Sequence, residues 1–181
     1  LQLSNSYESN RFLELLFILM EKLKGKEPAD YRNEFDTVIK EEISIRKNTN
    51  INEPLPYRYF RDAGYNTLNL RFMRYLFARV EYYLTENIGI QMQDSVWNYI
   101  RATGKDTSYH IEHILAMNNP QNLAYFESEE EFEMERNRLG ALLLLKGQDN
   151  KSSGNESYSN KLKTYHHTLY WNQTLIENFY H

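Results

Sequence analysis

Four polar side chains in the C-terminal half of the sequence could carry hydrolytic chemistry. His110, Glu112 and His113 stand close together in the segment TSYHIEHIL, and Asn150 follows a later apolar run. Hydrolysis of a phosphodiester needs a base that deprotonates water and a hard cation that holds the phosphate and stabilises the departing oxygen. One histidine and two oxygen ligands are enough for this chemistry. These four residues are therefore candidates for a hydrolytic site.

Two short strands and a helix would position these side chains. The segment that begins near Ser108 is rich in β-branched and aromatic residues, and the apolar run 142–145 is typical of a buried strand. We expect the two strands and a following helix to form a ββα finger. After the polar stretch QDNKSSGNES, interpreted as a loop, further helices are predicted over about 158–168 and 173–179.

An acidic helix is predicted between the two strands. Ser128 followed by Glu131 is a capping-box pattern, and Gly140 can close the helix. Residues 127–138 hold six Glu and two Arg, a local charge of −4. Because Glu alternates there with Phe132 and Met134, we interpret this helix as one with a solvated face.

The N-terminal part of the sequence is all-helical in pattern. Helices are predicted over about 12–25, 30–45, 67–86 and 94–100, and Gly104 breaks the last pattern. Asp30 could cap the second helix, whose inward residues would be Phe35, Val38, Ile39 and Ile43.

Composition excludes several classes of function. The chain has no Cys, which excludes disulfides, thiolate zinc sites and cysteine nucleophiles and suits a reducing cytoplasm. No apolar stretch reads as a membrane span or a signal peptide. The formal net charge is −4, so DNA affinity would need a local basic face or another domain. Because the sequence begins at Leu1 without Met, we expect a longer protein with further domains.

The segments HIEHILA, LGALLLL and DNKSSGNESYSNKLKTY resemble the HNH domain at the C-terminal end of GmrSD-type modification-dependent restriction endonucleases. The resemblance covers residues 108–166, and the preceding helices are weakly similar to the region before that finger. It implies a mainly α fold with a small ββα-metal (His-Me finger) element. We expect a helical region over 1–107, packed as one unit with the finger and C-terminal helices of 108–181.

Site roles follow from matching these positions to the motif of the family. The resemblance implies that His113 is the general base and that Glu112 and Asn150 bind the metal. It also matches Lys161 to a catalytic Lys. Supporting roles fall to His110, Ala141, Asn155 and Tyr158.

Two features of the sequence complicate this assignment. The Gly-Asn-Leu element of the family stands here as Gly140-Ala141-Leu142, and the missing Asn would help to hold the base in place. Adjacent residues of a regular strand also point to opposite faces, so Glu112 and His113 share one ion only if the strand ends or bends there.

The same residues allow other interpretations. His113 alone could be a partly buried histidine bonded to a neighbour. A zinc peptidase would need His at i and i+4 on a helix, whereas His110 and His113 are three apart. Five arginines interleaved with aromatic residues could contact phosphates, or pair with nearby acids instead: Arg58, Arg61, Arg71, Arg74 and Arg79.

The sequence therefore predicts a DNA endonuclease domain that depends on Mg²⁺ or Mn²⁺. The resemblance implies cytoplasmic defence against foreign or modified DNA, with nucleotide-dependent sensing in a separate N-terminal domain. The alternative is a catalytically impaired finger module for DNA binding or protein docking, which Ala141 favours.

Overall fold

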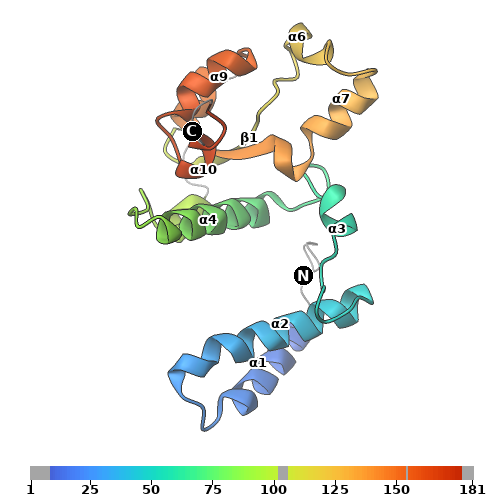
Figure 1. Cartoon of the computed structure of the whole chain (residues 1–181), viewed down its shortest axis with the longest axis vertical. Coiled ribbons are helices and arrows are strands. Elements are labelled where there is room, and N and C mark those ends of the chain that lie inside the picture. The colour runs from blue at the N-terminus through green and yellow to red at the C-terminus, as the bar shows by residue number, and fades with distance from the viewer. Residues whose placement is uncertain (1–8, 102–105, 154, 177–181) are drawn as a thin grey trace. The chain divides into compact units, whose positions relative to one another are not determined.

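The computed structural model describes residues 9–101, 106–153 and 155–176. The chain forms two compact units, Leu1–Asp62 and Ala63–His181 (Figure 1). The sequence predicted a boundary between a helical region and the finger at residue 107. That position lies inside the second unit. The physical reason is that Met73, Phe77 and Ala78, which precede residue 107, pack in one core with the strands of the finger.

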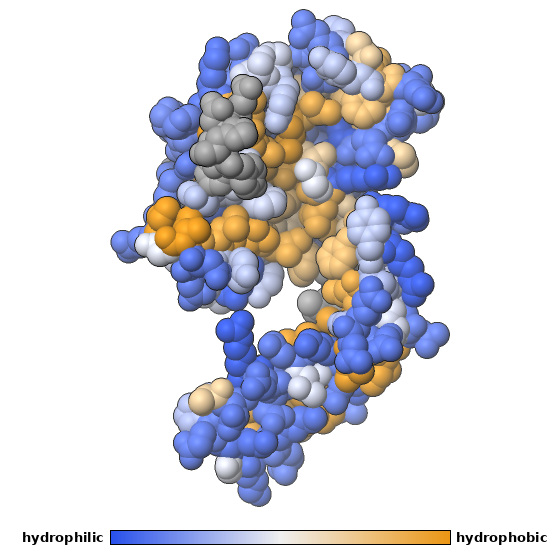
Figure 2. Space-filling model, in the orientation of Figure 1, coloured by the Kyte–Doolittle hydropathy of each residue, from blue (hydrophilic) through white to orange (hydrophobic). Residues whose placement is uncertain are grey.

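The first unit is built around a helical hairpin. Its elements are α1 (Ser9–Leu23), η1 (Pro28–Asp30), α2 (Tyr31–Lys47) and α3 (Arg58–Arg61). Both long helices were predicted by apolar periodicity, and the visible face of the hairpin is mostly hydrophilic (Figure 2).

Two details of α2 differ from the prediction. Asp30 makes no capping hydrogen bond, because its backbone is helical and ends the preceding 3-10 turn. Of the residues expected to face inward, Val38 and Ile43 are buried, but Phe35 and Ile39 are 43% and 47% exposed.

The second unit surrounds a small sheet with helices. It comprises α4 (Leu70–Asn87), α5 (Val96–Ile100), β1 (Tyr109–His113), α6 (Pro120–Leu123), α7 (Glu129–Arg136), η2 (Leu139–Ala141), β2 (Leu142–Lys146), α8 (Gly147–Ser153), α9 (Tyr158–Tyr165) and α10 (Tyr170–Gln173). This mainly helical architecture with two strands agrees with the fold class predicted from the sequence. Within the described ranges no helix is long and apolar enough to cross a membrane.

The sheet is a two-stranded antiparallel pair buried on both faces. Tyr109 pairs with Lys146 and His113 with Leu142. Leu142 and Leu144 join the core formed with α4, whereas Leu143 and Leu145 join a second core with α9. Successive strand residues point to opposite faces, so four buried leucines in a row require cover on both sides. This confirms the predicted buried strand.

Several helix boundaries in the second unit differ from the sequence prediction. The acidic helix α7 ends at Arg136, with Asn137 as its C-cap, rather than at Gly140. The predicted 158–168 helix ends at Tyr165, and the last helix within the described residues is α10, Tyr170–Gln173. The end of the predicted 173–179 helix and the break at Gly104 lie outside the described residues. The polar stretch expected as a loop contains α8, on which Asn150 lies.

Candidate active site around His113

His113 is the last residue of β1, and its imidazole is half-buried on the face of the sheet that packs toward α4. The Nε2 atom is 2.9 Å from Asn137 Oδ1, and the ring centroid lies 4.7 Å from that of Tyr65. Burial lowers the pKa of His113 below its ordinary value, although the Asn137 contact acts in the opposite direction. The lowered pKa favours the neutral imidazole, which is the form that acts as a base.

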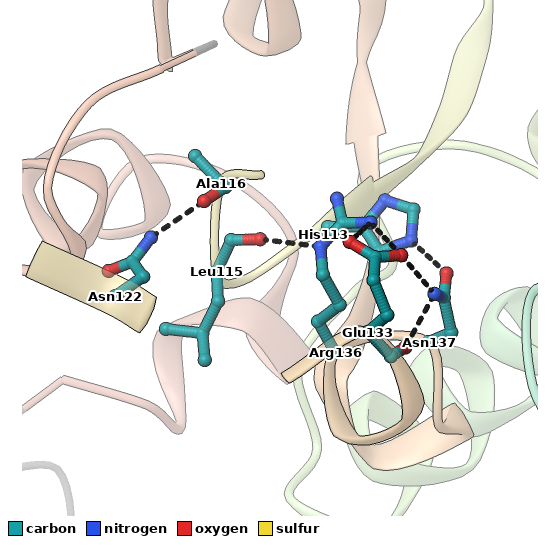
Figure 3. A network of polar contacts seen from close by, with 7 residues as sticks. All are labelled: His113, Leu115, Ala116, Asn122, Glu133, Arg136 and Asn137. Atoms are coloured by element: carbon teal, nitrogen blue, oxygen red, sulfur yellow. Dashed lines mark hydrogen bonds and ion pairs between the residues drawn. The ribbon is translucent and has the colours of Figure 1, made fainter. Parts of the chain in front are cut away.

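Asn137 is held in place by the helix that precedes it. Its Nδ2 donates to the carbonyl of Glu133 at 2.6 Å and to Glu133 Oε2 at 3.1 Å (Figure 3). The Glu133 carboxylate in turn lies 3.4 Å from Nη1 of Arg136. The end of α7 thus presents a connected set of polar side chains to the imidazole, although the sequence predicted only a solvated acidic face there.

The loop after His113 is fixed by side chains that bind its carbonyl groups. Arg136 Nε donates to the carbonyl of Leu115 at 3.4 Å, and buried Asn122 donates to that of Ala116 at 2.9 Å (Figure 3). The backbone N–H of Ile114 donates to the carbonyl of Ala141 at 3.0 Å. These contacts give the strand end a defined exit without the Asn that Ala141 replaces.

Gly64 allows a close backbone contact that places Asn137. A Cβ atom at Gly64 would lie 1.9 Å from the Asn137 carbonyl oxygen, so only glycine fits there. The adjacent N–H of Tyr65 donates to that oxygen at 2.8 Å, and Leu139 N–H donates to the carbonyl of Ala63 at 2.8 Å. The segment before α4 therefore fixes both Asn137 and the ring that packs on His113.

Glu112 points to the opposite face of the sheet, toward α9. Its carboxylate forms a buried ion pair with Lys161, whose Nζ also donates to the His113 carbonyl at 2.8 Å. Burial raises the pKa of Glu112, and the Lys161 ammonium opposes that shift. The strand remains regular through His113 and ends there, so the alternation of side chains separates Glu112 from the imidazole.

Glu112, one of the two predicted metal ligands, does not fit a metal beside His113 in this arrangement. The Glu112 carboxylate is already bound to an ammonium group and lies on the far face of the strand. In the described part of the chain, no group of three or more His, Cys, Asp or Glu residues could hold a metal ion. The roles of Glu112 and Asn150 as metal ligands stay predictions, and we derive no catalytic step through a metal.

The remaining predicted residues of the finger have identifiable places. His110 Nε2 is 2.8 Å from Ser108 Oγ. Asn150 is half-buried on α8, Asn155 is exposed before α9, and Tyr158 is the first residue of α9. None of these four is seen in the network around His113. Metal binding by Asn150 and the supporting roles of the other three stay predictions.

The five arginines proposed to contact DNA do not share one environment. Arg61 pairs with Asp62 at 2.9 Å and Arg58 lies over the Tyr59 ring, both in the first unit. In the second unit, half-buried Arg74 donates to the carbonyl of Ile100 at 3.4 Å. Exposed Arg71 and Arg79, the latter over the Tyr82 ring, remain available for phosphate contacts.

Sequence reasoning missed the two partners of the imidazole, Asn137 and Tyr65. It also missed the residues that hold Asn137 in place, which are Glu133, Arg136 and Gly64. Glu133 and Asn137 are four residues apart, a spacing that brings side chains together on a helix. That spacing was the available signal, but nothing in the sequence placed α7 beside β1.

The comparison with protein families agrees with the geometry. The family model described as "GmrSD restriction endonucleases, C-terminal domain" matches residues 57–180, more than half of the chain. The match confirms the resemblance of the finger region and extends it through α4. No curated protein and no solved structure matches the chain.

Proposed function

Because the chain belongs to the family of C-terminal domains of GmrSD restriction endonucleases, we propose that it is an HNH-type DNA endonuclease domain with His113 as general base. The observation that carries the proposal is the setting of His113. A half-buried imidazole ends a strand and is held by a side-chain network, and burial lowers its pKa, as a positioned base requires. The β1, β2 and α8 elements follow in the chain order of a ββα finger, which supports the HNH assignment.

In this proposal His113 removes a proton from water as the water oxygen attacks the phosphorus of a DNA phosphodiester. The bond between phosphorus and the 3′ oxygen breaks, which leaves a 5′ phosphate and a 3′ alkoxide that takes up a proton. Asn137 and Tyr65 hold the imidazole, and exposed Arg71 and Arg79 are candidates for contacts to the DNA backbone.

Metal dependence remains part of the proposal without an assigned site. A divalent cation such as Mg²⁺ or Mn²⁺ would stabilise charge on the phosphate and the leaving oxygen. We assign it no ligand here, because Glu112 is committed to Lys161.

The biological role we propose is defence against foreign or modified DNA in the cytoplasm. Support comes from the restriction endonucleases for which the matching family is named. A separate N-terminal domain would provide nucleotide-dependent target sensing, as in the proteins that this finger resembles.

A second candidate function is a catalytically impaired finger that binds DNA or docks a protein. Ala141 favours it, since the family motif has Asn at that position. The substitution Ala141→Asn discriminates between the two candidates. If it converts an inactive chain to an active one, the fold is that of a nuclease with an impaired site.

A plasmid-nicking assay with Mg²⁺ or Mn²⁺ tests the proposed activity. We expect the parent chain to nick supercoiled DNA and His113→Ala to lose that activity. His166→Ala, which alters an exposed histidine at the end of α9, is the matched control and should retain it. Failure of both the parent and Ala141→Asn to cut would reject the nuclease assignment, as would full activity in His113→Ala.

A further inference from the structure

We propose that Asn137, fixed by Glu133, is a positioning residue that sets the tautomer of His113, with the proton on Nε2 and the free lone pair on Nδ1. The inference rests on the proposed function, because it names the atom of the base that would accept the proton from water. It adds two residues that the sequence motif did not single out.

The orientation of the Asn137 amide follows from its other partners. Nδ2 faces two acceptors, the Glu133 carbonyl oxygen at 2.6 Å and Glu133 Oε2 at 3.1 Å. A flipped amide would place Oδ1 against both acceptors and lose both hydrogen bonds. The oxygen must therefore be the amide atom that faces His113, as drawn in Figure 3.

The tautomer of the imidazole follows from the amide. Oδ1 can only accept a hydrogen bond, so His113 Nε2 at 2.9 Å must donate one. A neutral imidazole carries one N–H, which leaves the lone pair on Nδ1. Among the described residues no hydrogen bond to Nδ1 is found. Nδ1 is also not one of their buried polar atoms without a partner, so a water molecule can reach it.

The network that fixes Asn137 is anchored at both ends. Arg136 lies 3.4 Å from the Glu133 carboxylate, and Tyr65 N–H donates to the Asn137 carbonyl at 2.8 Å. Backbone and side chain of Asn137 are thus both constrained, and a rigid partner is what a fixed tautomer requires.

This arrangement bears on the missing Asn at position 141. The family motif implies an amide there that helps to hold the base, and Asn137 supplies an amide to the imidazole from four residues earlier. Ala141 therefore leaves the orientation of His113 intact, and Ala141→Asn should change the tautomer little.

Nitrogen-15 NMR of the histidines in the whole chain tests the inference without DNA cleavage. We expect the parent to hold His113 in the form protonated at Nε2, and Asn137→Ala to give a mixture of both tautomers. Asn122→Ala is the matched control, because it removes another buried amide of the same network that binds the Ala116 carbonyl and not the imidazole. It should leave the tautomer unchanged.

Nicking kinetics provide the second readout. Asn137→Ala should lower kcat on the order of 10–100-fold or more with little change in KM, since partner groups that fix the tautomer of a functional histidine have effects of this size. A parent His113 protonated at Nδ1, or an unaltered tautomer in Asn137→Ala, would overturn the inference. If the tautomer shifts as expected but no variant cuts DNA, the orienting role stands and the proposed function fails.

Discussion

Replacement of Lys161 by Met should destabilise the second unit more than any other single lysine substitution on α9. The Lys161 side chain is 1% exposed and that of its partner Glu112 is 11% exposed. Removing one member of a buried pair leaves an uncompensated charge, at a cost of about 3–5 kcal/mol. The His113 carbonyl also loses its donor, which adds on the order of 1 kcal/mol. For a chain of this length, the 3–5 kcal/mol corresponds to a Tm lower by roughly 6–20 °C.

The stability that Lys161→Met loses should increase with pH. Burial already raises the pKa of Glu112 despite the neighbouring ammonium, and without Lys161 the opposing effect disappears. A carboxyl whose pKa is raised in the folded state does not destabilise the fold while it is protonated. The folded state loses stability as the pH rises through that pKa. The deficit of Lys161→Met relative to the parent should therefore be larger at pH 8 than at pH 5.

Urea unfolding followed by tryptophan fluorescence measures the stability of the second unit. Both tryptophans, Trp97 and Trp171, belong to the second unit, and Trp171 packs against the core on the α9 face of the sheet. Lys163→Met is the matched control, since Lys163 is exposed two residues further along the same helix. We expect it to change stability by less than about 0.5 kcal/mol.

A double variant separates charge from packing. Glu112→Leu combined with Lys161→Met removes both charges, and a hydrophobic replacement of a buried pair is often neutral. We expect most of the lost stability to return. Equal stability of Lys161→Met and Lys163→Met, or a double variant as unstable as the single one, would refute the reasoning. A stable Lys161→Met chain that no longer cuts DNA would instead support the catalytic role predicted for Lys161.

Three further outcomes are expected. Gly64→Ala should lower the free energy of unfolding, measured in urea, by about 1–3 kcal/mol, because its Cβ would overlap the Asn137 carbonyl. Gly140→Ala is the control and should keep the stability of the parent, because the space around Gly140 is open. Equal stabilities of the two variants would contradict this reasoning. The hydrogen bond from Arg11 lowers the pKa of Glu42 to about 2, so the first unit should lose stability as pH falls from about 4.5 through 2. Circular dichroism should show that Glu42→Gln loses less stability than the parent as the pH falls. Identical pH curves for the two proteins would exclude a contribution from the Glu42 carboxylate. Nicking should stop in EDTA and return with excess Mg²⁺ or Mn²⁺, and cutting that persists in EDTA would exclude metal dependence.

Local pattern was sufficient to predict the elements that carry the site. The apolar periodicity of α1 and α4 and the leucine run of β2 are properties of contiguous sequence, and each predicted its element close to the observed bounds. The capping box of α7 was also predictable, since Ser128 Oγ accepts from the Glu131 N–H at 3.1 Å. The resemblance to the family then selected His113 as the predicted general base.

The partners of His113 could not be predicted in the same way, because they depend on contacts between distant segments. Gly140 was the stronger local signal for a helix end, yet α7 ends at Arg136 and Asn137 is its C-cap. The reason is tertiary: the chain after Arg136 turns to bond with Ala63 and Tyr65, far earlier in the sequence. The α8 helix was missed because its polar residues are typical of a loop.

The alternation of a β-strand explains why Glu112 and His113 have different tasks although they are neighbours. A regular strand sends their side chains to opposite faces, so one is available to the polar network at the end of α7 and the other to α9. The two faces are still coupled through the backbone, because Lys161 binds both the Glu112 carboxylate and the His113 carbonyl. The buried pair therefore fixes the main chain from which the imidazole projects, while Asn137 fixes the imidazole itself. Glu112 and Lys161 therefore fix the end of β1, from which the side chain of His113 projects. Loss of either residue should shift the backbone of His113, although neither side chain contacts the imidazole ring.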